Sequence, residues 1–259
     1  MTYNQYIQNP MGVRNSVISN REMYREMYTK KWGEIKLREN GDIKYIIMKS
    51  KSDFYVYIKI PSEVVPKFYY DIVIRFYPPK DKKSVELERT LDNYNVQFYS
   101  NDPSFVFTFA HSFKKNGLIL DDMNPRMSKL ALKQNADVRN PNNQVGYVKS
   151  LYFAYLEIKN KGLLQKIRYT AAIPYDKNYL LSVIEDADVK IDKRQQEGDN
   201  LAKKKKRKST NDDKKSVTDN TNNSTSSHVI VPKNKISGKS KISAKSKISG
   251  KSKITGRKS

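Results

Sequence analysis

The chain has 259 residues, a formal net charge of +23 at pH 7 and no cysteine. The lack of thiols excludes disulfides, thiolate catalysis and cysteine-based zinc or iron–sulfur sites. The chain does not open with a basic segment and an apolar stretch, and no apolar run approaches the ~20 residues of a membrane helix. We therefore expect no secretion by a signal peptide and no membrane insertion.

Aromatic residues and charge divide the chain into two parts. All 28 Phe, Tyr and Trp residues lie at or before Tyr179, and a core needs such large apolar side chains to offset chain entropy. Residues 190–259 carry 21 Lys/Arg and 6 Asp/Glu, a net charge of +15, whereas residues 1–189 have a net charge of +8. We predict a flexible arm over 1–18, a folded domain over 19–189 and a disordered basic tail over 190–259.

The first half of the domain predicts one helix followed by strands. Capping-box spacing at Ser19 and Glu22 predicts a helix that ends before Gly33. Apolar runs rich in aromatic and β-branched residues then predict a mostly antiparallel sheet of five or six strands, with its first hairpin at Asn40-Gly41. The predicted strands cover residues 35–37, 43–47, 54–60, 68–77, 96–99 and 105–109.

The second half of the domain predicts helices. A short helix is predicted over 126–132, after Asn124-Pro125, and apolar residues at helical intervals predict a second over 146–161. A last helix is predicted to start at Tyr179 and continue into 185–188. Strands followed by helices are the pattern of an α+β domain, which is the fold class we predict.

Two groups of cations in the tail form the predicted nucleic-acid-binding segment. The first, which also resembles a nuclear localisation signal, consists of Lys203, Lys204, Lys205, Lys206, Arg207 and Lys208. The second lies in a six-residue repeat over 235–258 and consists of Lys235, Lys239, Lys241, Lys245, Lys247, Lys251, Lys253, Arg257 and Lys258.

A flexible chain of cations neutralises nucleic-acid phosphates without a fixed register. Phosphate contacts carry no sequence information, and the tail has no aromatic ring on which a base could stack. We therefore predict sequence-neutral binding to nucleic acid, with DNA as the first expectation. The alternatives are a solubility tail without a partner and binding to an anionic membrane surface.

One short motif suggests a nuclease. Glu157-Ile158-Lys159 matches the Glu-x-Lys end of the PD-(D/E)xK motif, for which Asp122 or Asp137 could supply the upstream metal ligand. An amphipathic helix accounts better for the same segment, and it would turn Glu157 and Lys159 away from the buried face.

The remaining polar groups suggest no catalytic centre. His111 and His228 are too far apart in sequence to indicate a metal site, and His111 fits a strand end with a satisfied hydrogen bond. Asp121-Asp122 and the acidic cluster 185–188 could hold a divalent cation, but a solvated turn and a negative helix end explain them as well. We predict no enzyme, no catalytic residue, no metal and no cofactor.

Aromatic side chains on the predicted strands are the last feature. Most should fill the core, while a remainder on the outer face could contact a protein partner or stack single-stranded bases. The side chains concerned are Tyr55, Tyr57, Tyr69, Tyr70, Phe76, Tyr77, Phe98 and Tyr99.

The segments 98–109 and 139–149 resemble proteins of tailed bacteriophages from low-GC Gram-positive hosts, and the resemblance covers roughly residues 70–165. It implies a phage-encoded protein in the host cytoplasm or the virion, and it implies no site residue. The leading hypothesis is a non-enzymatic virion structural or DNA-associated protein whose folded domain binds a protein partner or itself. A cytoplasmic regulator or RNA-binding protein is the alternative, and a nuclease is the third.

Overall fold

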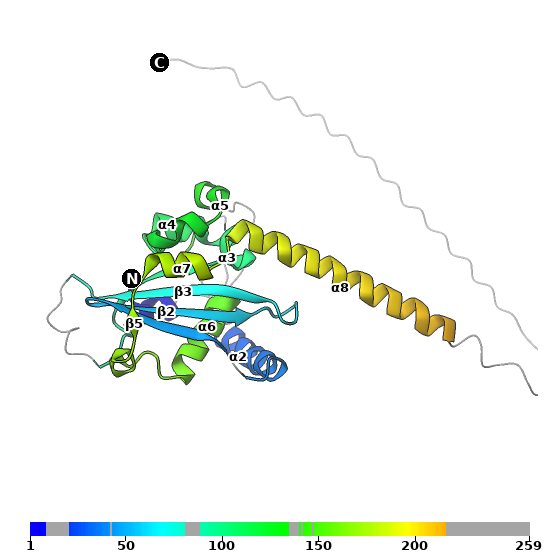
Figure 1. Cartoon of the computed structure of the whole chain (residues 1–259), viewed down its shortest axis with the longest axis horizontal. Coiled ribbons are helices and arrows are strands. Elements are labelled where there is room, and N and C mark those ends of the chain that lie inside the picture. Colours follow the sequence, from blue (N-terminus) through cyan, green and yellow to red (C-terminus); the bar gives the residue numbers. More distant parts are fainter. Residues whose placement is uncertain are drawn as a thin grey trace, which may run out of the picture. The chain divides into compact units, whose positions relative to one another are not determined.

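A five-stranded sheet with helices on both faces forms the centre of the structure (Figure 1). The predicted α+β class is confirmed, with an N-terminal helix, a mostly antiparallel sheet and then helices. Residues Met1–Asn211 form one compact unit and Asp212–Ser259 a second. Apart from the side chains of Arg21 and of residues 204–215, the computed structural model describes residues 1–8, 21–41, 43–80, 89–134, 140, 142–146 and 148–215.

Two helices come first, four strands follow, and the remaining elements of the described chain are helices apart from one short strand. In chain order they are α1 (Tyr3–Gln8), α2 (Arg21–Arg38), β1 (Tyr45–Ser50), β2 (Asp53–Pro61), β3 (Tyr69–Tyr77), β4 (Asn95–Ser100), α3 (Pro103–Thr108), α4 (Ala110–Lys115), η2 (Asp121–Arg126), α5 (Lys129–Lys133), α6 (Lys149–Asn160), η3 (Lys166–Tyr169), β5 (Ile173–Pro174), α7 (Lys177–Val183) and α8 (Ala187–Lys215).

The strands stand in the order β4-β3-β2-β1-β5. The four longer strands are antiparallel, and one register row runs across them through Ile46, Tyr57, Val73 and Tyr99. β5 is only two residues long and runs parallel to β1 at the opposite edge from β4.

Both faces of the sheet are covered, which explains why its strands read as nearly continuous apolar runs. On one face the ring of Tyr3 meets Phe76 and Tyr155 edge-on, at centroid distances of 5.1 and 6.1 Å. On the other face Tyr55 stacks on Tyr175 at 4.0 Å. Figure 1 shows α2 and α6 on one side of the sheet and α7 on the other.

The first eight residues are folded, contrary to the prediction of a flexible arm over 1–18. α1 buries Tyr3, Tyr6 and Ile7, and the Tyr3 amide donates a hydrogen bond to the Tyr94 carbonyl at 2.9 Å. Apolar side chains of this size are enough to hold a terminus against a sheet. Residues 9–20, including the predicted cap Ser19, lie outside the described part of the chain.

α2 continues past its predicted end at Gly33, so the predicted strand over 35–37 and the hairpin at Asn40-Gly41 are wrong. Apolar side chains on both sides of the glycine are buried, and this packing outweighs the cost of about 1 kcal/mol for a helical glycine. Asn40 and Gly41 end the helix instead. Their φ values are 59° and 72°, and the Gly41 amide donates to the Lys36 carbonyl at 2.7 Å, as in left-handed helix ends.

The predicted strand over 105–109 is also wrong, because these residues belong to α3 and its junction with α4. The Asp102 carboxylate accepts a hydrogen bond from the Ser104 amide at 2.9 Å, and Pro103 occupies the first helical position. A capping side chain followed by proline favours a helix start. Here it outweighs the strand preference of the phenylalanines that follow.

The later helices agree with the predictions in type and differ at their ends. The helix predicted over 146–161 forms as α6. The helix predicted over 126–132 starts only at Lys129, where Ser128 caps α5. α7 ends at Val183, so the last predicted helix breaks before α8 begins.

α8 makes residues 190–215 helical, which corrects the prediction that the disordered tail starts at residue 190. Ile191 packs against the core, and Arg194 Nε donates to the Tyr70 hydroxyl at 2.8 Å. The Lys190 ammonium lies 4.7 Å from the centre of the Phe68 ring. The predicted boundary at residue 189 therefore falls inside the first turn of α8, and residues 216–259 lie outside the described part.

Candidate functional site

The first group of predicted nucleic-acid-binding residues lies on α8. Lys203 is exposed, and the backbone from Lys203 to Lys208 is helical. Six consecutive helical positions at 100° intervals surround the axis within about 8 Å of its length. The cations of the 203–208 run are therefore concentrated in less than two turns. The nine repeat cations over 235–258 lie outside the described residues, so their role stays a prediction.

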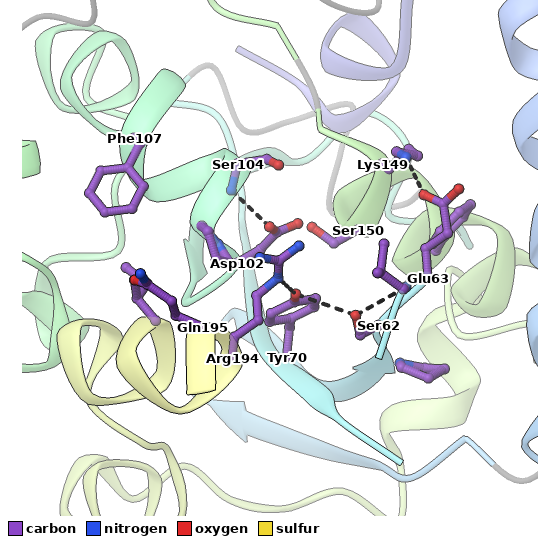
Figure 2. A pocket seen from close by; sticks show the side chains of 15 residues that line it. Ser62, Glu63, Tyr70, Asp102, Ser104, Phe107, Lys149, Ser150, Arg194 and Gln195 are labelled. Atoms are coloured by element: carbon purple, nitrogen blue, oxygen red, sulfur yellow. Dashed lines mark hydrogen bonds and ion pairs between the residues drawn. The ribbon is translucent and has the colours of Figure 1, made fainter. Parts of the chain in front are cut away.

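A cavity of about 440 Å³ lies beside the first turns of α8 (Figure 2). Its walls come from the loop after β2, the starts of α3 and α6, and α8. This volume is within the range of small-molecule sites. The polar side chains that line it are Ser62, Glu63, Tyr70, Asp102, Ser104, Lys149, Ser150, Arg194 and Gln195.

Asp102 is the buried acid of this cavity, with 7% of its surface exposed. One carboxylate oxygen caps α3 through the Ser104 amide. Burial raises the pKa of Asp102 above its usual value, and the nearby Ser150 hydroxyl, Ser104 amide, Arg194 and Lys149 offset this only in part. Figure 2 shows the Arg194 guanidinium and the Ser150 hydroxyl pointing toward the Asp102 carboxyl.

The start of α6 brings hydrogen-bond donors to the same place. Its N-cap, Val148, has no side chain that can accept from the first helical amides, so these amides need another partner. Ser150 is only 4% exposed. Its hydroxyl lies beside Asp102 without reaching hydrogen-bond geometry with any acceptor in the described part of the chain.

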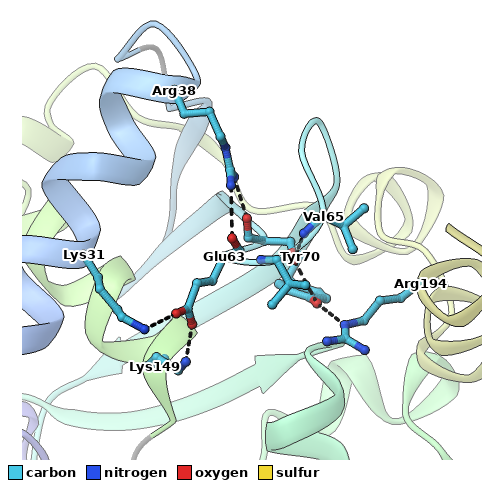
Figure 3. A network of polar contacts seen from close by, with 9 residues as sticks. Lys31, Arg38, Glu63, Val65, Tyr70, Lys149 and Arg194 are labelled. Atoms are coloured by element: carbon cyan, nitrogen blue, oxygen red, sulfur yellow. Dashed lines mark hydrogen bonds and ion pairs between the residues drawn. The ribbon is translucent and has the colours of Figure 1, made fainter. Parts of the chain in front are cut away.

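A network of charges holds the loop after β2 at the rim of the cavity (Figure 3). The Glu63 carboxylate pairs with Lys31 of α2 and Lys149 of α6. Arg38 donates to the carbonyls of Ser62 and Glu63 at 2.5 and 3.0 Å. Burial alone would raise the pKa of Glu63, but its hydrogen bonds to Lys149 and Lys31 hold the pKa below its usual value.

Among the described residues, the nuclease-like residues do not form a surface site. Glu157 lies on the buried face of α6 and is fully buried, so the expectation that it would point away from the core is wrong. Its carboxylate pairs with Lys36 at 2.9 Å, while Lys159 is exposed. Asp122 accepts a hydrogen bond from the Tyr175 hydroxyl at 2.5 Å. Asp137 lies outside the described residues.

The acidic cluster 185–188 has a structural role. Glu185 pairs with Lys190 and Lys193, and its carbonyl accepts a hydrogen bond from Asn101 at 3.2 Å. Within the described part of the chain, no group of three or more His, Cys, Asp or Glu residues could hold a metal ion.

His111 lies in α4 and not at a strand end. Its Nδ1 is buried without a hydrogen-bond partner among the described residues, so the expected satisfied hydrogen bond at this atom is not found.

Six of the eight strand aromatics are buried, and Tyr69 and Tyr77 are partly exposed. These eight rings therefore form no open aromatic face for bases.

No protein-family model, curated protein or solved structure matches this chain. Among the described residues, no helix combines the length and apolar character needed to cross a bilayer.

The cavity was not predicted from sequence. Asp102-Pro103-Ser104 carries a readable helix-start signal, but the signal does not show that Ser150 and Arg194 come to the same place. These two residues follow at distances of 48 and 92 positions along the chain.

Proposed function

We propose that the protein is a non-enzymatic, nucleic-acid-associated protein that binds DNA phosphates without sequence preference. The contacts come from the 203–208 run of α8 and from the cations of the 235–258 repeat. The resemblance to tailed-phage proteins supports a role in the virion or the host cytoplasm, in which the folded unit contacts a protein partner or a second copy.

The observation that carries the proposal is that α8 is packed on the folded unit at its first turns and carries a run of cations further along. α8 is held by Ile191 and Arg194, and nine residues after Arg194 it reaches six consecutive cations. Like charges four positions apart, as at Lys203 and Arg207, destabilise a helix by a few tenths of a kcal/mol per pair. Bound phosphates would remove this repulsion and release counterions from the nucleic acid.

The test is a salt titration of DNA affinity on two unrelated duplexes. Three full-length variants are compared with the unchanged chain, each with lysine or arginine replaced by glutamine. One alters the 203–208 run and one the nine repeat cations. The third is a control that alters the exposed Lys114, Lys115, Lys129 and Lys133 of α4 and α5.

The slope of log affinity against log salt should change by about 0.9 for each phosphate that a variant no longer neutralises. Each tail variant should lose affinity and slope in proportion to the cations that it removes, equally on both duplexes, and the control should lose little. A control as weak as the tail variants, or a duplex preference that survives high salt, would place the DNA contact in the folded unit and refute the proposal.

A further inference from the structure

We propose that the cavity at the base of α8 is a binding site for a phosphate monoester, held by Arg194, Ser150 and the first amides of α6. This site is separate from the 203–208 run and does not depend on the proposed DNA binding.

Three sets of donors converge on the cavity. The first turn of α6 is uncapped by Val148, and uncapped helical amides favour an anion. The Ser150 hydroxyl is buried in the wall beside the Asp102 carboxylate, and no acceptor in the described part meets it at full hydrogen-bond geometry. Arg194 donates from Nε to the Tyr70 hydroxyl, and its guanidinium faces the Asp102 carboxyl without an ion pair to it. Its two terminal nitrogens can therefore bind a ligand. A planar guanidinium with two parallel donors suits phosphate oxygens.

The charged groups around the cavity have a net positive charge, which an anion can neutralise. Lys31 and Lys149 share the single carboxylate of Glu63. Arg194 and Asp102 are the remaining charged groups of the wall. The five groups together carry one net positive charge when Asp102 is ionised, and two when it is protonated.

Asp102 selects the kind of anion. Its carboxylate cannot turn away, because one oxygen caps α3. A fully ionised oxyanion such as sulfate would face this carboxylate across the cavity. A phosphate monoester, with a second pKa of about 6, shares one proton with Asp102 in a hydrogen bond. An internal phosphodiester has no such proton, so the site should take inorganic phosphate, a nucleoside monophosphate or the phosphorylated end of a strand.

The volume of the cavity favours a monoester with an organic part. At about 440 Å³ it is larger than a phosphate group needs. Phe107 and Val64 line it with 44% and 64% of their surfaces exposed. An aromatic ring at the rim can stack on a nucleobase.

The first experiment is calorimetric titration of the full chain with inorganic phosphate and with sulfate at matched ionic strength. Phosphate should bind at least about tenfold more tightly than sulfate. Non-specific binding to the basic tail would not distinguish these two anions. Arg194→Gln should weaken phosphate binding about tenfold or more, because a charged hydrogen-bond donor is removed. Arg168→Gln removes one exposed charge outside the cavity and should leave binding unchanged.

Asp102→Asn separates selectivity from folding, since asparagine is an equally good N-cap. This variant should bind sulfate and phosphate within about threefold of each other, because the facing negative charge is gone. Equal binding of both anions by the unchanged chain, unaltered selectivity in Asp102→Asn, or equal effects of Arg194→Gln and Arg168→Gln would overturn the proposal. If Arg194→Gln does not fold, the first two comparisons decide.

A second pair of ligands identifies the source of the phosphate. Adenosine monophosphate is compared with a short oligonucleotide carrying either a 5′-phosphate or a 5′-hydroxyl, at salt high enough to suppress binding by the tail. A gain from the 5′-phosphate assigns the site to strand ends, and binding of the mononucleotide alone assigns it to free nucleotides. Both results support the site. The site is refuted if neither adenosine monophosphate nor the 5′-phosphorylated oligonucleotide binds more tightly than the 5′-hydroxyl oligonucleotide. DNA affinity through the tail is measured independently of these results.

Discussion

Glu157 shows how a sequence motif and its structural role can differ. The carboxylate is fully buried and meets Lys36 from a different helix, with Lys161 at 4.0 Å. A buried ion pair of this kind contributes little net stability, but it is costly to break because one charge is left unpaired. The pair joins α2 to α6.

Lys36→Ala should reduce the free energy of unfolding by about 3 kcal/mol, because it leaves the Glu157 charge buried without its main partner. Replacing both residues by methionine should recover most of this loss, since no buried charge remains. Urea unfolding of the two variants measures the difference. A double variant as unstable as Lys36→Ala would contradict this account of the pair.

The sequence predicts long apolar elements well and helix ends poorly. β1 to β4 and α6 are predictable because long apolar runs report burial directly. Three of the errors fall at Gly33, at Asn40-Gly41 and at residues 105–109. At each of them a local preference competes with tertiary packing or with a single capping side chain, and periodicity does not measure either effect.

The candidate site was less predictable than the fold for a related reason. The 203–208 run is contiguous, so composition alone identifies it. The cavity combines Asp102 and Ser150 from the starts of α3 and α6 with Arg194 from the third turn of α8. Their proximity follows from how α3, α6 and α8 pack, and no short-range pattern encodes that packing.

Gly33 inside α2 and Gly41 just after it offer a matched test of the end of this helix. Gly33→Ala should stabilise the protein by about 0.5–1 kcal/mol, because a Cβ there meets no atom within 4 Å and alanine is the better helix former. Gly41→Ala should destabilise it by about 1 kcal/mol, because φ at this position is +72°. Thermal unfolding gives both values. A stabilising Gly41→Ala would mean that α2 does not end in a left-handed turn.

The loop after β2 should respond to pH through Glu63. The pKa of Glu63 is lowered in the folded state, so its contribution is present above the unfolded pKa of about 4.3 and is lost as the pH falls below it. Glu63→Gln should cost at most about 1 kcal/mol at pH 7, because the ion pairs are partly exposed. The cost should vanish toward pH 3.

Urea unfolding across this range measures the effect, and Lys149→Gln should show the same trend. A Glu63→Gln penalty that stays constant from pH 7 to pH 3 would show that the carboxylate acts through packing and not through its charge.

At the scale of the whole molecule, the folded part includes the first turns of α8. A chain ending at residue 202 should be more stable than one ending at residue 189 by about 2–4 kcal/mol. The shorter chain lacks the burial of Ile191 and the charged hydrogen bond from Arg194 to Tyr70. Equal unfolding midpoints for the two chains would show that α8 is not part of the cooperative unit.

Gly198 lies on α8 between the docked residues and the cations. A Cβ at this position would contact no atom within 4 Å, so no packing offsets the cost of glycine inside a helix. Opening of the helix should therefore begin here, with fast amide hydrogen exchange after residue 198 and slow exchange before it. A helix that bends at Gly198 would let the cations beyond it meet phosphates in many orientations, while the first turns of α8 stay packed on the folded unit. Contact with the uniform, repeating sugar-phosphate backbone of a nucleic acid requires this freedom of orientation.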